Sequence, residues 1–159
     1  MHRLILFRHA HAESPRNGQP DLERPLSATG EAEAIAAAAW LVAQDLVPDR
    51  VVCSTALRTR QTLERVEQAL GSPAAKFDER IYEATPGELI EVAESHRDAG
   101  CVMLVGHNPG FEQLAALLTS GQTGDYRGMP PGGIAVVELP ASDTSLEPGA
   151  GRLAAFWSP

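Results

Sequence analysis

An α/β fold with a mainly parallel sheet is the architecture that the sequence predicts. Short apolar runs alternate along the chain with longer segments of helical composition, an order typical of parallel sheets covered by helices. The clearest strand, residues 101–106, is apolar throughout, as expected for a strand buried on both faces. The chain has 159 residues, enough to bury the core of one domain. We therefore expect a single domain over residues 1–159.

Two strands and two helices are predicted in the N-terminal half. The strands are residues 3–7 and 50–54, and the helices are residues 26–46 and 55–71. Either Ser27 or Thr29 is suited to cap the first helix, and Pro48 lies beyond its end. Gly71 is expected to end the second helix. A polar loop rich in Pro, Gly, Asn and Asp, residues 12–25, follows the first strand.

The C-terminal half is predicted to contain an extended segment, three strands and two helices. In chain order these are residues 75–83, 86–100, 101–106, 107–121, 132–140 and 151–159, of which 86–100 and 107–121 are the helices. Pro86 suits the first turn of its helix. The last two strands are close in sequence, so we expect them to pair antiparallel at an edge of the sheet. The polar loop between them, residues 141–150, is expected to be mobile.

Charge and composition exclude several classes of protein. The formal net charge of −8 argues against a nucleic acid or an anionic membrane as a partner, since both require a basic surface. Cys53 and Cys101 lie in apolar runs with no metal-binding or redox spacing, which fits buried thiols in a reducing compartment. The apolar stretch near the N-terminus, residues 4–7, is too short for a signal sequence or a membrane span. These features predict a cytoplasmic protein.

Polar side chains follow three of the predicted strands. Arg8 and His9 follow the first strand, Arg58 lies shortly after the second, and His107 follows the strand at 101–106. Ligands of open parallel sheets bind at the carboxyl ends of the strands, so we expect these residues to meet. Arginine matches the oxygens of a phosphoryl group, and a neutral histidine can attack phosphorus. The convergence predicts a phosphoryl-transfer site.

The residues alone leave other interpretations open. Arg8 and His9 would also suit a solvated strand end, and His107 a turn. Arg60 has the spacing for a surface ion pair with Glu64. The His-x-His pair of His9 and His11 is also typical of a zinc or other metal site, given further ligands. The metal-dependent hydrolase barrels known for that pair need ~250 residues, more than this chain has.

Four motifs together resemble the histidine phosphatase superfamily. They are "LFRHAHAE" at residues 6–13, "RPLSATGEAEA" at 24–34, "CSTALRTRQT" at 53–62 and "VGHNPG" at 105–110. The chain is most similar to the short SixA-type phosphohistidine phosphatases of that superfamily. The resemblance implies a three-layer phosphoglycerate mutase-like fold: a mainly parallel central sheet flanked by helices, with one antiparallel edge. It implies no metal and no organic cofactor.

The resemblance also implies roles for particular residues. His9 corresponds to the nucleophile that becomes phosphorylated, and Arg8, Arg58 and His107 to the rest of the phosphate pocket. Glu79, in a Glu-Arg-x-Tyr pattern, resembles the general acid of the mutases, although SixA-type proteins often lack a dedicated acid. His11 matches no motif position and is expected to be a loop residue near the rim.

A phosphatase acting on a phosphorylated histidine of a signalling protein is the function that these features predict. The short chain leaves little to roof the site, which would suit a phosphohistidine on the surface of a protein partner. A labile P–N bond also needs less help from an acid than an ester does. A phosphatase for small phosphomonoesters, a non-catalytic module that binds phosphorylated residues, and a zinc hydrolase are the alternatives.

Overall fold

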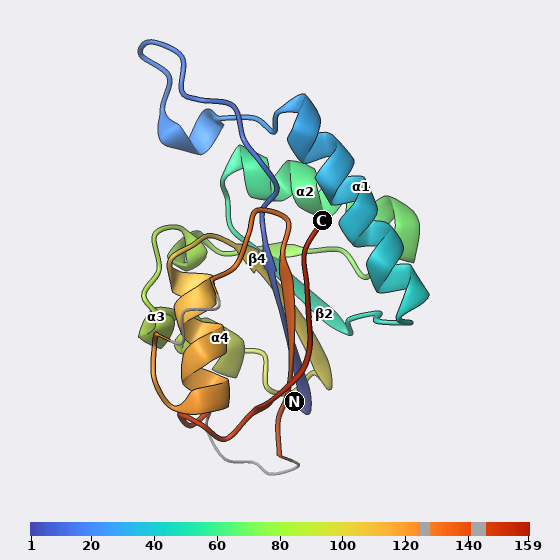
Figure 1. Cartoon of the computed structure of the whole chain (residues 1–159), viewed down its shortest axis with the longest axis vertical. Coiled ribbons are helices and arrows are strands. Elements are labelled where there is room, and N and C mark those ends of the chain that lie inside the picture. The colour runs from blue at the N-terminus through green and yellow to red at the C-terminus, as the bar shows by residue number, and fades with distance from the viewer. Residues whose placement is uncertain (125–127, 141–145) are drawn as a thin grey trace.

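Six strands form one sheet through the middle of the molecule, and helices cover both of its faces (Figure 1). The structure is a computed structural model that describes residues 1–124, 128–140 and 146–159. The strands are β1 Arg3–Arg8, β2 Arg50–Cys53, β3 Lys76–Phe77, β4 Cys101–Gly106, β5 Ile134–Glu138 and β6 Arg152–Trp157. The α-helices are α1 Ala28–Ala43, α2 Leu57–Leu70, α3 Pro86–Glu94 and α4 Gly110–Ser120, and two 3₁₀ turns are η1 Asp21–Glu23 and η2 Glu79–Ile81.

The strand order β3-β2-β4-β1-β5-β6 confirms the predicted α/β fold. β1, β2, β3 and β4 are parallel to their neighbours within this group, and β5 and β6 pair antiparallel at one edge, as predicted. β5 also pairs antiparallel with β1, so it connects the parallel part to the edge strand. The carboxyl ends of β1, β2 and β4 therefore lie side by side.

The central strands are buried on both faces because helices pack on each side. Leu4 and Leu6 of β1 belong to a core cluster with residues of α3 and α4, including Leu89 and Phe111. Side chains alternate along a strand, so Ile5 of the same strand faces the opposite cluster, with residues of α1 and α2. Figure 1 shows the two helix pairs on opposite sides of the sheet. The result is a three-layer arrangement.

The signals expected at the helix ends are largely present. Ser27 is the N-cap of α1, and its hydroxyl accepts a hydrogen bond from the Gly30 amide at 3.0 Å. Thr85 and Glu88 form a capping box at the start of α3, where Pro86 occupies the first turn. Gly71 ends α2 in the left-handed conformation, with φ 60°.

Two predicted segments differ from the structure. α3 ends at Glu94 rather than at residue 100, because the chain tightens into turns with i to i+3 hydrogen bonds from His96 to Ala93 and from Ala99 to His96. The extended segment 75–83 contains only the two-residue β3, because the Asp78 carboxylate accepts a bond from the Arg80 amide and starts η2. Of the predicted mobile loop 141–150, residues 141–145 lie outside the described residues. Within the described part of the chain, no helix is long and apolar enough to cross a membrane.

Gly30 allows α1 to pack closely against the segment that follows β1. A Cβ at this position would lie 1.9 Å from the backbone oxygen of His11. We expect Gly30→Ala to lower the free energy of unfolding by about 1–3 kcal/mol or more, because overpacking usually costs an amount in this range. Gly87→Ala is the matched control in the first turn of α3, where the new Cβ would meet only the Thr85 hydroxyl at 3.9 Å. Urea unfolding of both variants checks this, and equal stability of the two would contradict it.

Candidate active site

A pocket of about 610 Å³ opens where the carboxyl ends of β1 and β4 meet the start of α2. Arg8, His9, Arg58 and His107 all line it. The register explains why they meet: Arg8 pairs with Gly106 across β1 and β4, so His9 and His107 follow adjacent strand ends. The structure thus brings together the four residues singled out from the sequence.

One ring nitrogen of His9 has no hydrogen-bond partner among the described residues. The other nitrogen, Nδ1, lies 2.6 Å from the carbonyl oxygen of Ala10. A carbonyl only accepts hydrogen bonds, so the neutral ring carries its hydrogen on Nδ1 and a lone pair on Nε2. Burial lowers the pKa of His9 from 6.5 to about 4. The hydrogen bond to Ala10 opposes this effect, and the nearby charges of Arg58 and Arg8 add smaller contributions that lower the pKa. His9 is therefore neutral at neutral pH, as a nucleophile must be.

His107 is a second neutral histidine, edge-on to His9 with ring centroids 5.2 Å apart. Its Nε2 lies 2.8 Å from the Ser54 hydroxyl, which itself accepts a bond from the Ala56 amide at 3.4 Å. Nδ1 is buried and has no hydrogen-bond partner among the described residues. Burial, and then the proximity of His9 and Arg58, lowers the pKa of His107 to about 3.

Both arginines line the pocket and are held by acceptors of the protein. Arg58 is only 5% exposed, and its terminal nitrogens donate to the Asp21 carbonyl at 2.8 Å and the Asp21 carboxylate at 2.9 Å. Arg8 donates to the Met129 carbonyl at 2.7 Å. The Nε of each arginine is buried without a partner in the described part of the chain. Both guanidinium groups belong to residues that line the pocket, so they place fixed positive charge where an anionic ligand would bind.

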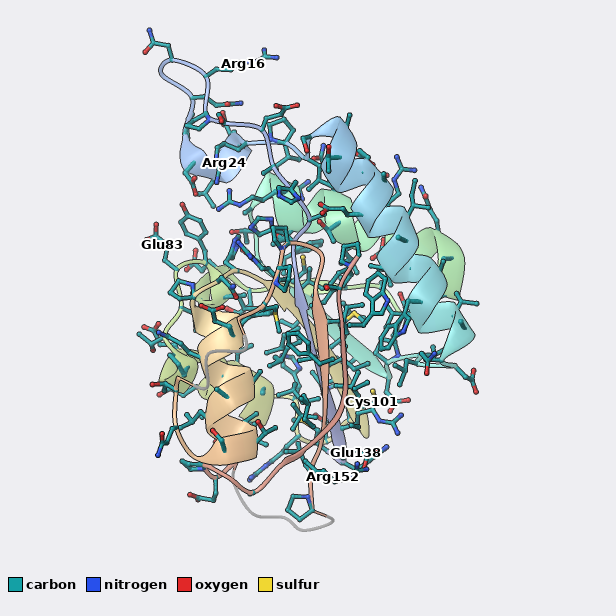
Figure 2. The ribbon with its side chains drawn as sticks, viewed as in Figure 1. Arg16, Arg24, Glu83, Cys101, Glu138 and Arg152 are labelled. Atoms are coloured by element: carbon teal, nitrogen blue, oxygen red, sulfur yellow. The ribbon has the colours of Figure 1, made fainter. Side chains whose placement is uncertain are left out.

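Asp21, in the loop before α1, is a site residue that the sequence analysis did not single out. Its carboxylate binds Arg58, accepts a 2.5 Å hydrogen bond from the Tyr82 hydroxyl and a 2.9 Å bond from Arg24. These bonds, led by that of Tyr82, hold the pKa of Asp21 well below its usual range, so it is an anion. Figure 2 labels Arg24 directly after η1, in the segment that connects β1 to α1. The short spacing of Asp21 and Arg24 was the one local pattern that could have predicted an ion pair here. The other partners of Asp21, Arg58 and Tyr82, are 37 and 61 residues away in the sequence.

We expect Asp21→Asn to reduce kcat/KM for a phosphoryl substrate on the order of tenfold. The amide keeps the shape of the side chain but loses the charge that fixes Arg58, and a hydrogen bond to a charged group contributes about 1.5–3 kcal/mol. Asp98→Asn is the control, because that carboxylate pairs with Arg50 away from the pocket. Steady-state kinetics of both variants checks this. Similar kinetics for the two would contradict a role for Asp21 in holding Arg58.

Glu79, the general acid that the resemblance suggested, lies away from the pocket. It is an exposed residue of η2, and the residues lining the pocket, as far as the chain is described, do not include it. Its neighbour Asp78 is paired with Arg80 at 2.7 Å. The geometry therefore gives no support to Glu79 as the general acid.

The structure also bears on the metal alternative. His11 lines the pocket, but its Nδ1 is 2.8 Å from the carboxylate of Glu33. Over residues 1–124, 128–140 and 146–159, no three His, Cys, Asp or Glu side chains are grouped so that they could hold a metal ion. The His-x-His pair thus has no third ligand in this region, and the zinc interpretation gains no support from the donor set.

Comparison with known proteins identifies the family. The sequence profile of the histidine phosphatase superfamily (branch 1) matches residues 4–99, more than half of the chain. The chain belongs to this superfamily. An uncharacterised protein of Mycobacterium tuberculosis (strain H37Rv) is 36% identical over 96% of this chain and 99% of its own length.

Two relatives of this chain carry more informative names. Phosphohistidine phosphatase SixA of Escherichia coli (strain K12) is 30% identical over 76% of this chain and 77% of its own length. A solved protein histidine phosphatase SixA complexed with tungstate superposes with a TM-score of 0.82, at 27% identity, covering 98% of this chain and 96% of the other. The predicted family is thereby confirmed, and phosphatase activity is the property that the family and these relatives support.

Proposed function

We propose that this protein is a phosphohistidine phosphatase that removes the phosphoryl group from a phosphorylated histidine of a signalling protein through a phospho-His9 intermediate. The observation that carries the proposal is that one pocket is lined by a neutral His9, whose Nε2 has no hydrogen-bond partner among the described residues, and by the guanidinium groups of Arg8 and Arg58. That set contains a nucleophile and the donors for the charge on a phosphoryl group.

The proposed reaction has two steps. Nε2 of His9 attacks phosphorus while the bond to the leaving nitrogen of the substrate breaks, and water then attacks phospho-His9 to release inorganic phosphate. Arg8, Arg58 and His107, which line the pocket, stabilise the phosphoryl oxygens, where charge is spread in the transition state. Asp21 keeps Arg58 in place.

The exposed mouth of the pocket favours a substrate on a protein surface. Side chains at its edge remain largely in solvent: the side chain of His11 is 52% exposed and that of Asp21 47% exposed. A phosphorylated histidine on another protein can reach such a site without a lid closing over it. The similarity to SixA proteins points to the same substrate class. The free thiols of Cys53 and Cys101 suit a cytoplasmic setting.

The substrate class is tested by comparing two kinds of phosphoryl donor. The protein is incubated with a histidine-phosphorylated phosphocarrier protein and, separately, with a panel of sugar and aryl phosphates, and phosphate release is measured. The proposal predicts that kcat/KM for the phosphohistidine protein exceeds that for every small ester. Faster turnover of a small ester would favour the phosphomonoesterase alternative, and binding of the phosphorylated protein without release would favour a non-catalytic module.

The protonation of His9 predicts resistance to mild acid. Its folded-state pKa is about 4, so the ring stays neutral and nucleophilic as the pH falls through 6 and 5, and gains a proton only near pH 4. We expect activity to be lost only as that proton binds. NMR titration of the imidazole signals checks this, with His9→Ala identifying the relevant signal. A midpoint near the ordinary 6.5 would contradict the proposed environment.

A further inference from the structure

His11 is a third histidine of the pocket, and the reaction described above does not use it. It lies two residues after His9, with the fully buried Ala10 between them, and both histidines line the pocket. The ring of His11 is half exposed at the mouth, whereas His9 lies deeper. The mouth is the side from which the substrate enters and the side on which its leaving group remains.

Helix α1 fixes both the backbone and the ring of His11. The Glu33 carboxylate accepts the backbone N–H of His11 at 2.9 Å, and both of its oxygens lie 2.8 Å from Nδ1 of the ring. The Ser27 amide donates to the His11 carbonyl at 3.0 Å. A loop residue near a rim would need none of these bonds, so the ring is held in a defined position.

The pairing with Glu33 also sets what the other ring nitrogen can do. A carboxylate only accepts, so Nδ1 carries a hydrogen toward Glu33, and Nε2 is the ring nitrogen left to interact with a bound substrate. Nε2 has no hydrogen-bond partner among residues that the structure describes. The side chain of Glu33 is only 16% exposed, so its pairing with the ring is partly shielded from solvent.

The other titratable groups of the pocket are poorly placed to supply a proton. His9 and His107 are both neutral at neutral pH, because burial and neighbouring positive charges lower the pKa of each ring. Asp21 is an anion whose oxygens already accept bonds from Arg58, Arg24 and Tyr82. Glu83 lies at the rim, and Figure 2 shows it at the outer edge of the molecule.

We propose that His11, held by Glu33, is the general acid that protonates the leaving group. The proposal rests on the function proposed above. As Nε2 of His9 forms the bond to phosphorus, the bond from phosphorus to the leaving atom breaks, and that atom takes the proton from Nε2 of His11. In the second step the neutral Nε2 of His11 takes a proton from the water that attacks phospho-His9. Inorganic phosphate leaves, and His11 is protonated again.

A general acid matters most for a poor leaving group, and this provides the test. The rates of phospho-His9 formation from p-nitrophenyl phosphate and from phenyl phosphate are compared in wild type, His11→Asn and Glu33→Gln. The Asn side chain keeps a donor for Glu33 where Nδ1 was and lacks Nε2. His2→Asn, an exposed histidine outside the pocket, is the control.

The proposal predicts a selective loss. In His11→Asn the rate with phenyl phosphate falls about 10²-fold or more, the scale of general acid catalysis, whereas the rate with p-nitrophenyl phosphate falls only a few-fold. Glu33→Gln should show the same pattern more weakly, and His2→Asn should not change. Two results for His11→Asn would overturn the proposal: equal losses with both substrates, or no loss with either. It would also be overturned if the wild-type rate already fell steeply from the nitrophenyl to the phenyl ester. Phospho-His9 should still form in His11→Asn. If the proposed function itself were wrong, wild type would form no phospho-His9, so the two failures can be told apart.

Discussion

Replacement of His9 by alanine is expected to abolish phosphoryl transfer. No other described group in the pocket combines a free lone pair with a neutral ring held among two arginines, so nothing takes over the attack on phosphorus. We expect the rate to fall by about 10⁴-fold or more, the scale seen when a covalent nucleophile is removed. Phosphate release from a phosphohistidine protein is the measurement.

The control for that variant separates chemistry from folding. His9→Ala removes a partly buried ring from a pocket, not from either of the two main core clusters, so the thermal midpoint should stay close to that of wild type. His2→Ala, at an exposed position before β1, should retain full activity. A folded His9→Ala protein that retains activity within tenfold of wild type would defeat the assignment of His9.

Replacement of Arg58 by methionine is the second large effect. It removes a buried guanidinium whose Nε has no partner among the described residues, and methionine preserves much of the apolar stem. Loss of one preorganised donor to a developing charge typically costs about 10²–10³ in kcat. We expect a reduction of that size, together with weaker inhibition by tungstate as a probe of oxyanion binding.

Arg60 offers a matched control on the same helix. It is exposed, lies over the ring of Phe77 at 5.9 Å rather than in the pocket, and has the same chemistry as Arg58. Arg60→Met should therefore leave kcat and tungstate inhibition unchanged. Comparable losses in the two variants would mean that general positive charge, and not the position of Arg58, supports the reaction.

The negative net charge of the chain does not conflict with an anion site. Charge that attracts a phosphoryl group has to be local, and Arg8, Arg24 and Arg58 supply it within one pocket of a chain whose net charge is −8. Asp21 is the counter-charge for two of these arginines. Because its carboxylate already binds them, the cluster stays assembled before substrate arrives, which lowers the reorganisation needed during reaction.

The sequence was informative where strands end and helices begin. Arg8, His9 and His107 could be predicted because they follow apolar strands directly, and parallel strands bring their ends to one edge of a sheet. Ser27, Pro86 and Gly71 act locally on the backbone, so they could be predicted from their neighbours alone.

Contacts between distant segments could not be predicted in this way. The bonds of Asp21 to Arg58 and Tyr82 depend on how the loop before α1 folds over the end of the sheet, and no periodicity encodes that path. The same is true of His11 and Glu33, whose contact depends on α1 packing closely at Gly30. Glu79 shows the converse: a motif-like pattern in a short segment did not fix where its side chain lies.

Trapping of the covalent intermediate tests the central claim most directly. The protein is mixed with a phosphohistidine donor, quenched within milliseconds in alkali, which preserves phosphohistidine, and digested for mass spectrometry. The account predicts a single phosphorylated histidine, His9, that forms and decays at the rate of turnover and is absent from His9→Ala. Turnover with no phosphorylated residue, or with the phosphoryl group on His107 or Ser54 instead, would contradict it.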